Sequence, residues 1–264
     1  DAERMIEDFM IAANETVARH FINNDKPGIF RVHDTPKPEK ISAFISFCNA
    51  NGKQIKGKFT NINPHTFQKL LSELKLDEKE APLYKSLAVR SMPKAYYSYE
   101  NIGHFGLASR NYTHFTSPIR RYPDLFTHRL IREFFFSNNN TEEYFQGVLP
   151  DVCKQSSDRE LKAVEAEREV DKVKMAEYME SHVGETFKGM VSGVQEYGLF
   201  IQLDNLVEGL LSVEELNDDY YIYQEDVMRL VGRKTNKIYK IGDEIEVKCV
   251  QANKFNGQID FSLK

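Results

Sequence analysis

Of the residues in this chain, two adjacent arginines, Arg120 and Arg121, are best suited by type and position to bind an anion and act on it. They lie between two prolines in the segment TSPIRRYP (116–123). Pro123 cannot donate a backbone hydrogen bond, so a helix can begin near it but would be broken or kinked if it ran through it. The arginines therefore fall at the N-terminus of a helix predicted over 123–136. Free N–H groups and the positive end of the helix dipole favour phosphate there.

The pair has a simpler reading, in which both guanidinium groups are solvated or pair with nearby carboxylates such as Asp124 or Glu133. Aromatic and histidine side chains around the arginines favour the phosphate-binding interpretation. Aromatic residues interleaved with basic ones are typical of surfaces that stack on bases beside phosphate contacts. The residues concerned are Tyr112, His114, Phe115 and Tyr122, with the hydroxyl of Ser117 in the same turn.

The stretch around the arginines also resembles a known family. The motif GHFGLA, followed by Y-x-HFTSPIRRYPDL-x-x-HR (residues 103–129), is similar to the late catalytic-domain motif of the RNase II/RNase R exoribonucleases, nearer the RNase R branch. The resemblance implies a processive, hydrolytic, magnesium-dependent 3′-to-5′ exoribonuclease that releases nucleoside 5′-monophosphates. Arg120 matches the family arginine that stabilises charge on the scissile phosphate, and Arg121 is the runner-up or a backbone-phosphate contact.

Two helices carry acidic residues that the resemblance places near RNA. Residues 2–22 repeat apolar side chains at helical spacing, and IEDFMIAANETVA resembles the family helix whose carboxylate faces the terminal ribose. Glu7 or Asp8 is the matching position. A charged helix is predicted over 156–182, where Glu165 or Glu167 would lie near the RNA end. The alternative is that these carboxylates are solvated surface groups.

Three further segments connect the motifs. Residues 29–44 predict a short strand, a proline-bounded turn and a helix, and 63–76 and 82–92 predict two more helices. His33 and His104 are expected to be structural rather than catalytic.

Residues 184–264 change character, because apolar and polar residues alternate and helical spacing disappears. Five short strands are expected to form a small barrel, with Gly198 as a bulge or bend and the last hairpin turning at Asn256-Gly257. The pattern F-x-G-x-V-x-x-V-x-x-Y-G-x-F-I-x-L resembles the OB-fold repeat of ribosomal protein S-one, which binds single-stranded RNA.

Stacking and phosphate-contact residues follow from that resemblance. The stacking positions would be Phe187, Tyr197 and Phe200, although a core position is the alternative for one of them. An insert before the last two strands supplies possible phosphate contacts, namely Arg229, Arg233, Lys234 and Lys237.

The expected fold class is therefore α+β. A helix-rich C-terminal part of an RNB catalytic domain (1–182) precedes an S-one type OB barrel (184–264).

Composition limits the partners. The net charge is −5, with nine Lys/Arg against fourteen Asp/Glu in 184–264, so RNA affinity must come from local groups rather than a generally basic surface. Three widely spaced cysteines lack metal-ligand spacing and suit buried thiols in a reducing cytoplasm. With no run apolar enough to span a membrane, we expect a cytoplasmic monomer that binds single-stranded RNA.

The metal site is the departure from the family pattern. The family's four-aspartate cluster lies upstream of the helix that begins this chain, which looks cut from something longer. The sole adjacent aspartate pair, Asp218-Asp219, lies in the barrel insert. Magnesium would therefore be held by residues outside this chain. Two hypotheses remain, a portion of an exoribonuclease and a non-catalytic single-stranded RNA-binding module.

Overall fold

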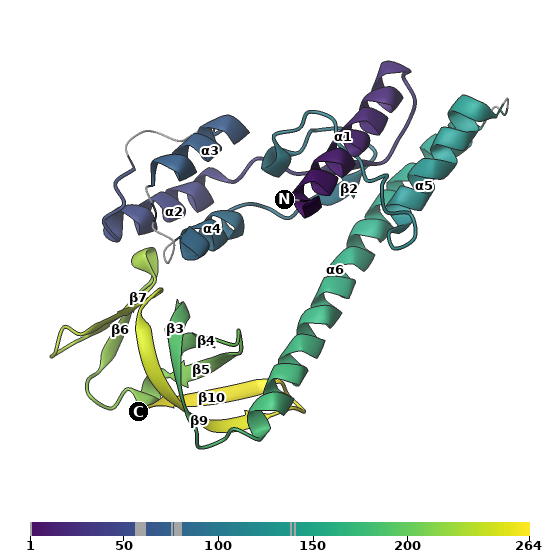
Figure 1. The fold of residues 1–264 in the computed structure, drawn as a ribbon. Helices are drawn as coiled ribbons and strands as arrows, with labels where there is room; N and C mark the ends of the chain where they lie inside the picture. Colours follow the sequence, from purple (N-terminus) through teal and green to yellow (C-terminus); the bar gives the residue numbers. More distant parts are fainter. Residues whose placement is uncertain (1, 56–61, 75, 77–80, 138, 140) are drawn as a thin grey trace. The chain divides into compact units, whose positions relative to one another are not determined.

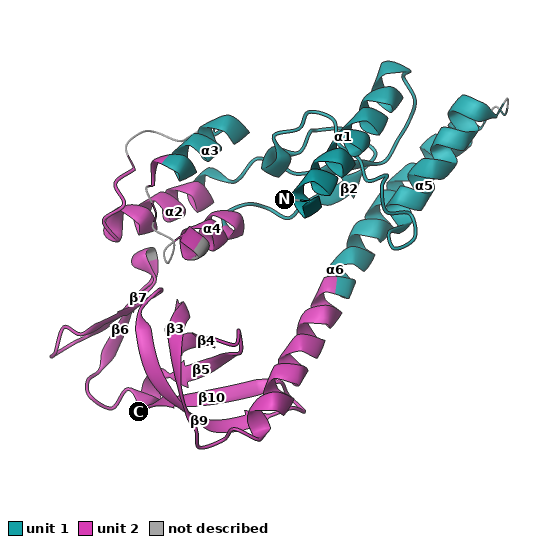
Figure 2. Cartoon of the chain, viewed as in Figure 1, with its two compact units in different colours: residues 1–38, 59–72, 91–163 teal, residues 39–58, 73–90, 164–264 magenta. Residues whose placement is uncertain are grey.

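The computed structural model describes residues 2–55, 62–74, 76, 81–137, 139 and 141–264. Helices occupy most of the first 180 residues and strands more than half of the rest, which confirms the predicted α+β class (Figure 1). The chain divides into two compact units, coloured separately in Figure 2. Unit 1 comprises residues 1–38, 59–72 and 91–163, and unit 2 comprises residues 39–58, 73–90 and 164–264.

Unit 1 is built from helices around a two-stranded sheet. Its elements are α1 (Ala2–Asn23), β1 (Phe30–Val32), most of α3 (Pro64–Glu73), β2 (Tyr96–Ser98), η1 (Phe105–Leu107), α5 (Tyr122–Ile131), the π-helical turn η2 (Arg132–Phe136) and the first part of α6 (Glu142–Glu180). The antiparallel pairing of β1 with β2 sets Arg31 opposite Tyr97. The core joins α1, α5 and α6 through Phe21, Ile29, Tyr97, Phe126, Leu130, Leu149 and Cys153.

Helix α1 buries less of its predicted apolar face than expected, and α5 is also only partly covered. In α1, Phe21 is buried, whereas Met5, Ile6 and Phe9 are 54–68% exposed. The helical period was predicted correctly, but nothing in the described residues covers the first two turns. In α5 the core takes Phe126 and Leu130, while Leu125 stays 37% exposed at the edge of the apolar stripe.

Helix α6 begins earlier than predicted, at Glu142 rather than near 156, and runs through Pro150. Leu149 and Cys153 flank this proline and are buried in the unit 1 core, so tertiary packing outweighs the proline's cost to the helix. Farther along, the helix is exposed almost all round over 158–174. Pairs at i,i+3, such as Lys172–Glu169 at 2.8 Å, support that segment.

Unit 2 contains nearly all of α2 (Pro38–Ala50), α4 (Ala81–Arg90), the rest of α6 and all the remaining strands. A closed five-stranded barrel in the order β10-β5-β4-β3-β9 confirms the predicted barrel. Its strands are β3 (Thr186–Gln195), β4 (Gly198–Leu203), β5 (Glu208–Ser212), β9 (Glu244–Asn253) and β10 (Gln258–Leu263). Along β4 the interior receives Leu199, Ile201 and Leu203, because alternate residues of a strand face opposite sides.

Gly198 was expected to form a bulge or a bend, and the structure shows no bulge there. It is the first residue of β4 and pairs with Gln195, so the chain reverses over the two residues between them. A Cβ at Gly198 would lie 2.4 Å from the Leu211 carbonyl oxygen, which explains the glycine. The irregularity in register lies instead in β3, between Val191 and Gly193.

The insert between β5 and β9 forms a separate three-stranded antiparallel sheet of β6 (Tyr221–Gln224), β7 (Arg229–Gly232) and β8 (Ile238–Lys240). One carboxylate holds its β7–β8 turn. Asp219 Oδ2 accepts hydrogen bonds from the backbone N–H groups of Lys234 and Thr235 and from the Thr235 hydroxyl. These donors lower the pKa of Asp219, with the Thr235 N–H contributing most.

All three cysteines are free and buried, as predicted. Burial raises the pKa of Cys48 and Cys153 to about 12, so both are protonated thiols at neutral pH. Among the described residues, no helix combines the length and the apolar character needed to cross a bilayer.

The end of α6 packs closely on the β9–β10 hairpin, and this contact generates the first prediction. Gly257 has φ +67°, and a Cβ there would lie 3.1 Å from Lys172 Cβ. Gly257→Val should lower the free energy of unfolding by more than about 1 kcal/mol, through backbone strain and loss of this approach. Urea unfolding measures the change.

Gly147 is the matched control. It lies inside α6 with open space around its Cα. Gly147→Ala should leave stability unchanged or raise it by roughly 0.4–1 kcal/mol. Equal losses in the two variants would show that α6 does not depend on the hairpin contact.

Candidate nucleic-acid interface

The arginine pair lies in a turn that leads directly into α5. The backbone N–H groups of Arg120 and Arg121 both donate to the Ser117 carbonyl, at 3.3 and 3.1 Å. Arg121 is the N-cap residue with an extended backbone, and Pro123 occupies the first turn of the helix. The predicted turn and proline-started helix are thus confirmed, and the arginines do stand at a helix N-terminus.

Asp124 fixes this turn from the inside. Its side chain is fully buried, and Oδ1 accepts a hydrogen bond from the Ser117 N–H at 2.8 Å and one from Arg121 Nη2 at 2.7 Å. The Arg121 side chain is 20% exposed. One carboxylate oxygen therefore joins the start of the turn, the second arginine and the first turn of α5.

The two arginines have different environments as a result. Arg121 is paired with Asp124, which matches the simpler reading of the sequence. Arg120 is exposed, and within the described part of the chain its guanidinium has no hydrogen-bond or ion-pair partner. The Arg120 guanidinium can bind a phosphate that approaches from solvent. The Arg121 guanidinium would first have to break its ion pair with the buried Asp124 carboxylate.

Behind the turn lies a network of histidine, tyrosine and amide side chains. Asn14 is 3% exposed, and its amide donates to the Tyr112 hydroxyl at 3.0 Å and accepts from the Phe115 N–H at 3.0 Å. The Tyr97 hydroxyl lies 2.9 Å from His114 Nδ1. Tyr112 is only 7% exposed. Its ring packs in the interior and has little surface for stacking on a base, which is the role that the sequence predicted.

Burial keeps the histidines of this network neutral. The pKa of His114 falls to about 3, chiefly because of burial and then because of the Arg121 charge. The pKa of His104 falls to about 4, through burial and the neighbouring His33. His33 donates from Nε2 to the Pro93 carbonyl and accepts the Gly106 N–H at Nδ1, which confirms a structural histidine.

A clamp that sequence reasoning missed joins β1 to α6. Arg31 makes two hydrogen bonds to the Glu160 carboxylate, at 2.6 and 3.0 Å, and its guanidinium lies 4.6 Å from the centre of the Tyr97 ring. The Ser157 hydroxyl, one turn earlier in α6, accepts the Tyr97 N–H. Arg31 and Glu160 are 129 residues apart, so no local pattern could have paired them.

The other unit 1 candidates lie on the surface. Glu7 and Asp8 on α1 are exposed, and so is Tyr122, whose ring lies 6.0 Å from that of Phe126. Ser117 and His114 are partly buried. Glu165 and Glu167, in the unit 2 part of α6, are also exposed. Among the described residues of each unit, no hydrogen bond or ion pair brings these acidic side chains together.

In unit 2, two of the three predicted stacking residues share a cavity of about 570 Å³. Tyr197 and Phe200 line it, with their rings 6.1 Å apart and nearly perpendicular. Phe187 is half-buried in β3 and lies 6.4 Å from the His182 ring, away from the cavity lining. Tyr197 is 55% exposed and can receive a base from solvent.

The insert's basic residues are partly engaged within their own sheet. Arg229 donates to the Gln224 side chain at 2.7 Å. Lys237 pairs with Asp218 at 3.0 Å and lies 4.7 Å from the Tyr239 ring. Arg233 and Lys234 are exposed. Because Asp218 and Asp219 are used by the sheet, they do not provide a metal pair.

A further exposed aromatic residue was missed. Phe255, in the β9–β10 turn, is 90% exposed beside Lys254, whose ammonium lies 5.8 Å from the ring. Its place in the turn KFNG was the available signal, because turn residues between two strands point outward.

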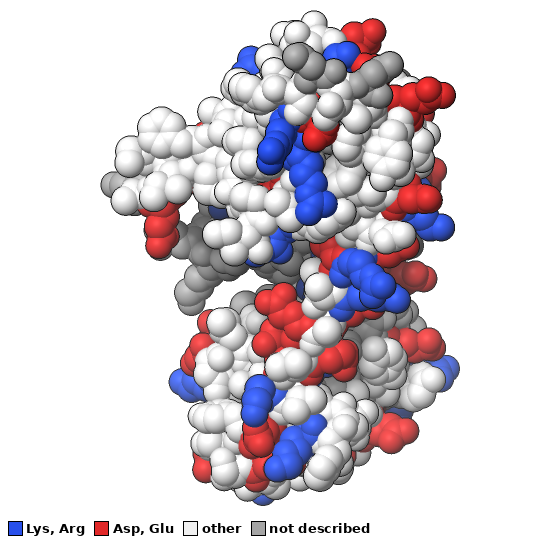
Figure 3. Space-filling view, turned by 90° about the vertical axis from the view of Figure 1, so that its right-hand side faces the viewer, with Lys and Arg blue, Asp and Glu red and all other residues white. Residues whose placement is uncertain are grey.

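The face shown in Figure 3 has no dominant sign of charge. On the face in Figure 3, basic and acidic side chains are interspersed rather than gathered into a patch of one sign. Among the described residues there is also no group of three or more His, Cys, Asp or Glu placed to hold a metal ion. The described residues therefore do not fit the divalent metal site that the resemblance implies.

Comparison with known proteins finds family matches for both the helix-rich part and the barrel. The RNB domain model matches residues 1–137, and the S1 RNA binding domain model matches residues 180–264. Ribonuclease R 1 of Lactococcus lactis is 46% identical over 98% of this chain and 32% of its own length. Ribonuclease R of Escherichia coli is 37% identical over 100% of this chain and 33% of its own length.

Solved structures give the same result. Mycoplasma genitalium RNase R in complex with ribose-methylated single-stranded RNA superposes with a TM-score of 0.92 at 32% identity, covering 100% of this chain and 42% of that one. The complex of the same enzyme with double-stranded RNA gives 0.81 at 27% identity over the same shares. The chain thus spans about a third of the length of the curated relatives described above.

The buried carboxylate gives the second prediction. Asp124→Asn keeps an acceptor for the Ser117 N–H but removes the charge opposite Arg121, so it should cost about 1.5–3 kcal/mol of unfolding free energy. Urea titration measures it. Asp151→Asn, at an exposed position of α6, should stay within about 0.5 kcal/mol of the parent. Equal stabilities for the two variants would contradict a structural role for Asp124.

The neutral histidines give the third prediction. In the unfolded chain both histidines bind a proton below their ordinary pKa of 6.5. In the folded chain the pKa of His104 is about 4 and that of His114 is about 3, so they bind a proton only at lower pH. Stability should therefore be full above pH 6.5 and fall as the pH drops from 6.5 towards 4 and then 3. Each histidine contributes up to about 1.4 kcal/mol per pH unit.

Urea titrations at pH 7, 6, 5 and 4 measure this slope. In His114→Gln the slope should be shallower over the same range, because one of the two groups no longer titrates. A slope identical to that of the unmodified chain would rule out His114 as a source.

Proposed function

Because the chain belongs to the RNB family and carries an S1 RNA-binding domain, we propose that it is part of a processive, hydrolytic 3′-to-5′ exoribonuclease that releases nucleoside 5′-monophosphates. The Ribonuclease R relatives support an exoribonuclease as the longer protein, and the barrel supports RNA as the partner. The domain limits proposed here are 1–182 for the catalytic part and 184–264 for the barrel. The longer protein would act in the cytoplasm as a monomer.

The observation that carries this proposal is the difference between the two arginines. Arg120 stands exposed at the N-terminus of α5, in a turn that Asp124 holds from inside. A guanidinium in that position can donate two hydrogen bonds to phosphate oxygens, in geometry that a lysine cannot reproduce. We assign Arg120 to the scissile phosphate and Arg121 to the support of the turn.

Membership of the family implies a divalent metal, and magnesium is our expectation for the longer protein. Because the described residues do not fit such a site, no catalytic step is assigned to a metal here. What this chain's own residues supply is an arginine that can stabilise negative charge on phosphate and a barrel that can guide single-stranded RNA.

A second candidate function belongs to the 264-residue chain by itself. With no metal-binding group among the described residues, it would bind single-stranded RNA without cleaving it. Incubating labelled RNA and Mg²⁺ with this chain, and separately with the full-length protein from the same reading frame, distinguishes the two. Cleavage by the 264-residue chain would overturn the binding-only candidate, and inactivity of the full-length protein would overturn the nuclease proposal.

The arginine pair gives the fourth prediction. In the full-length protein, Arg120→Ala should lower turnover by about 10²–10³ while RNA affinity and melting temperature stay near those of the parent. Arg121→Ala is the matched neighbour and should chiefly lower the melting temperature, because it leaves the buried Asp124 unpaired. Single-turnover cleavage, RNA binding and thermal melting together separate the effects. A pure binding defect in Arg120→Ala would remove its catalytic assignment.

A further inference from the structure

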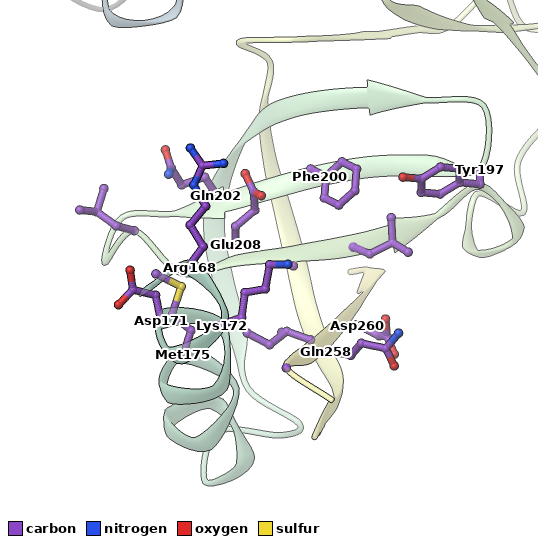
Figure 4. A pocket seen from close by; sticks show the side chains of 15 residues that line it. Arg168, Asp171, Lys172, Met175, Tyr197, Phe200, Gln202, Glu208, Gln258 and Asp260 are labelled. Atoms are coloured by element: carbon purple, nitrogen blue, oxygen red, sulfur yellow. The ribbon is translucent and has the colours of Figure 1, made fainter. Parts of the chain in front are cut away.

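The cavity in unit 2, here called the helix–barrel pocket, lies between α6 and the outer face of β4, β5 and β10 (Figure 4). Both walls belong to unit 2 and are tied together. Lys254 lies 3.7 and 3.8 Å from the carboxylates of Glu177 and Glu180, and its backbone N–H donates to Glu180. Gly257 sits against Lys172 of the helix. The pocket is thus a fixed feature of the helix–barrel contact.

Strand register determines the wall that the barrel presents. In the pairing of β4 with β5, Phe200 lies opposite Leu210 and Gln202 lies opposite Glu208. These four side chains alternate with the buried interior residues, so they share the outer face that lines the pocket. The wall therefore has an aromatic–apolar row beside a row of polar side chains, and Tyr197 stands at the end of the aromatic row (Figure 4).

Helix α6 supplies the opposite wall, and its charges are of both signs. Arg168 and Lys172 rise from the helix towards the strands, and both line the pocket (Figure 4). Carboxylates of Asp171, Glu208 and Asp260 also line the pocket. A ligand that fits must offer an apolar ring face, hydrogen-bond donors for the carboxylates and negative charge for the cations.

A nucleotide meets all three requirements. Its base can stack on Phe200 and its phosphate can contact Arg168 or Lys172. The base edge then faces Gln202 and Glu208. One Glu208 oxygen already accepts the Ser192 hydroxyl at 2.6 Å, and the other is left for a ligand donor. A volume of about 570 Å³ lies inside the range of small-ligand pockets, roughly 300–1,000 Å³.

The base edge decides which nucleotide fits best. A carboxylate only accepts hydrogen bonds, and it pairs well with the exocyclic amino group of cytosine. Uracil has a carbonyl oxygen at the corresponding position, so the same carboxylate would face a second acceptor there. The one donor on that edge of uracil, N3–H, is flanked by two carbonyl oxygens that repel a carboxylate. Stacking alone does not make this distinction, because every base has a π face.

We propose that the helix–barrel pocket binds one nucleotide of single-stranded RNA and prefers bases that carry an exocyclic amino group, with Glu208 as the residue that selects them. This inference rests on the proposed RNA-binding function of the barrel and adds a specificity to it. The phosphate of the same nucleotide contacts Arg168 or Lys172, so the helix and the barrel contribute to one site.

Cytosine and uracil oligonucleotides of equal length make the cleanest test, because the two bases have the same ring size. The 264-residue chain, titrated into labelled oligo(C) and oligo(U) and followed by fluorescence anisotropy, should bind oligo(C) about tenfold more tightly. Glu208→Gln should bring the ratio of the two affinities close to one. Arg168→Gln should weaken both by a similar factor and reduce the salt dependence of binding.

Glu214→Gln is the matched control, because this exposed glutamate follows β5 and lies outside the pocket lining. It should leave the ratio unchanged. Equal affinity for the two oligonucleotides in the parent chain would overturn the base preference while leaving RNA binding intact. A preference that survives in Glu208→Gln would remove Glu208 as its source. Absence of binding to either oligonucleotide would overturn the RNA-guiding function itself.

Discussion

Asp124 carries a charge with no exposed surface, and such a charge is tolerated only where hydrogen bonds and an opposite charge compensate for lost hydration. The Ser117 N–H and the Arg121 guanidinium supply that compensation through one oxygen. Moving either donor away leaves the carboxylate underpaired, so the turn from 117 to 121 and the first turn of α5 are fixed as a unit. The exposure of Arg120 is a consequence, because its neighbour already occupies the buried acceptor.

The same arrangement explains why the interior behind the turn is rich in polar side chains yet carries little charge. Burial is the main reason that His104 and His114 stay neutral at physiological pH. The charge of Arg31 adds to the effect at both histidines, and that of Arg121 adds at His114. Neutral histidines can accept or donate single hydrogen bonds to tyrosine and backbone groups without needing counter-ions. Asn14, which links α1 to the irregular segment 112–115, completes this framework.

Unit 2 distributes its chemistry differently. Its formal charge is acidic over 184–264, and several of its basic side chains are paired within the insert sheet or along α6. Affinity for RNA would therefore depend on a few placed cations and aromatic faces rather than on a broad positive field. The helix–barrel pocket has that character, since Arg168 and Lys172 stand beside Phe200 and three carboxylates.

The sequence by itself was sufficient for features whose cause is local or whose motif is contiguous. Pro123 predicted the start of α5, and the alternation of apolar and polar residues from 184 onward predicted the barrel. The contiguous motif TSPIRRYPDL indicated the family. Only the tertiary structure separated Arg120 from Arg121, buried Tyr112, left Met5 and Phe9 exposed, and extended α6 through Pro150. Tyr112 is buried against Asn14, which is 98 residues away in the sequence. Arg121 pairs with Asp124 only three residues on, but the burial that makes this pair decisive comes from packing. Burial and long-range pairing are set by the packing of whole elements, and no local pattern of residue types encodes which distant side chain will be met.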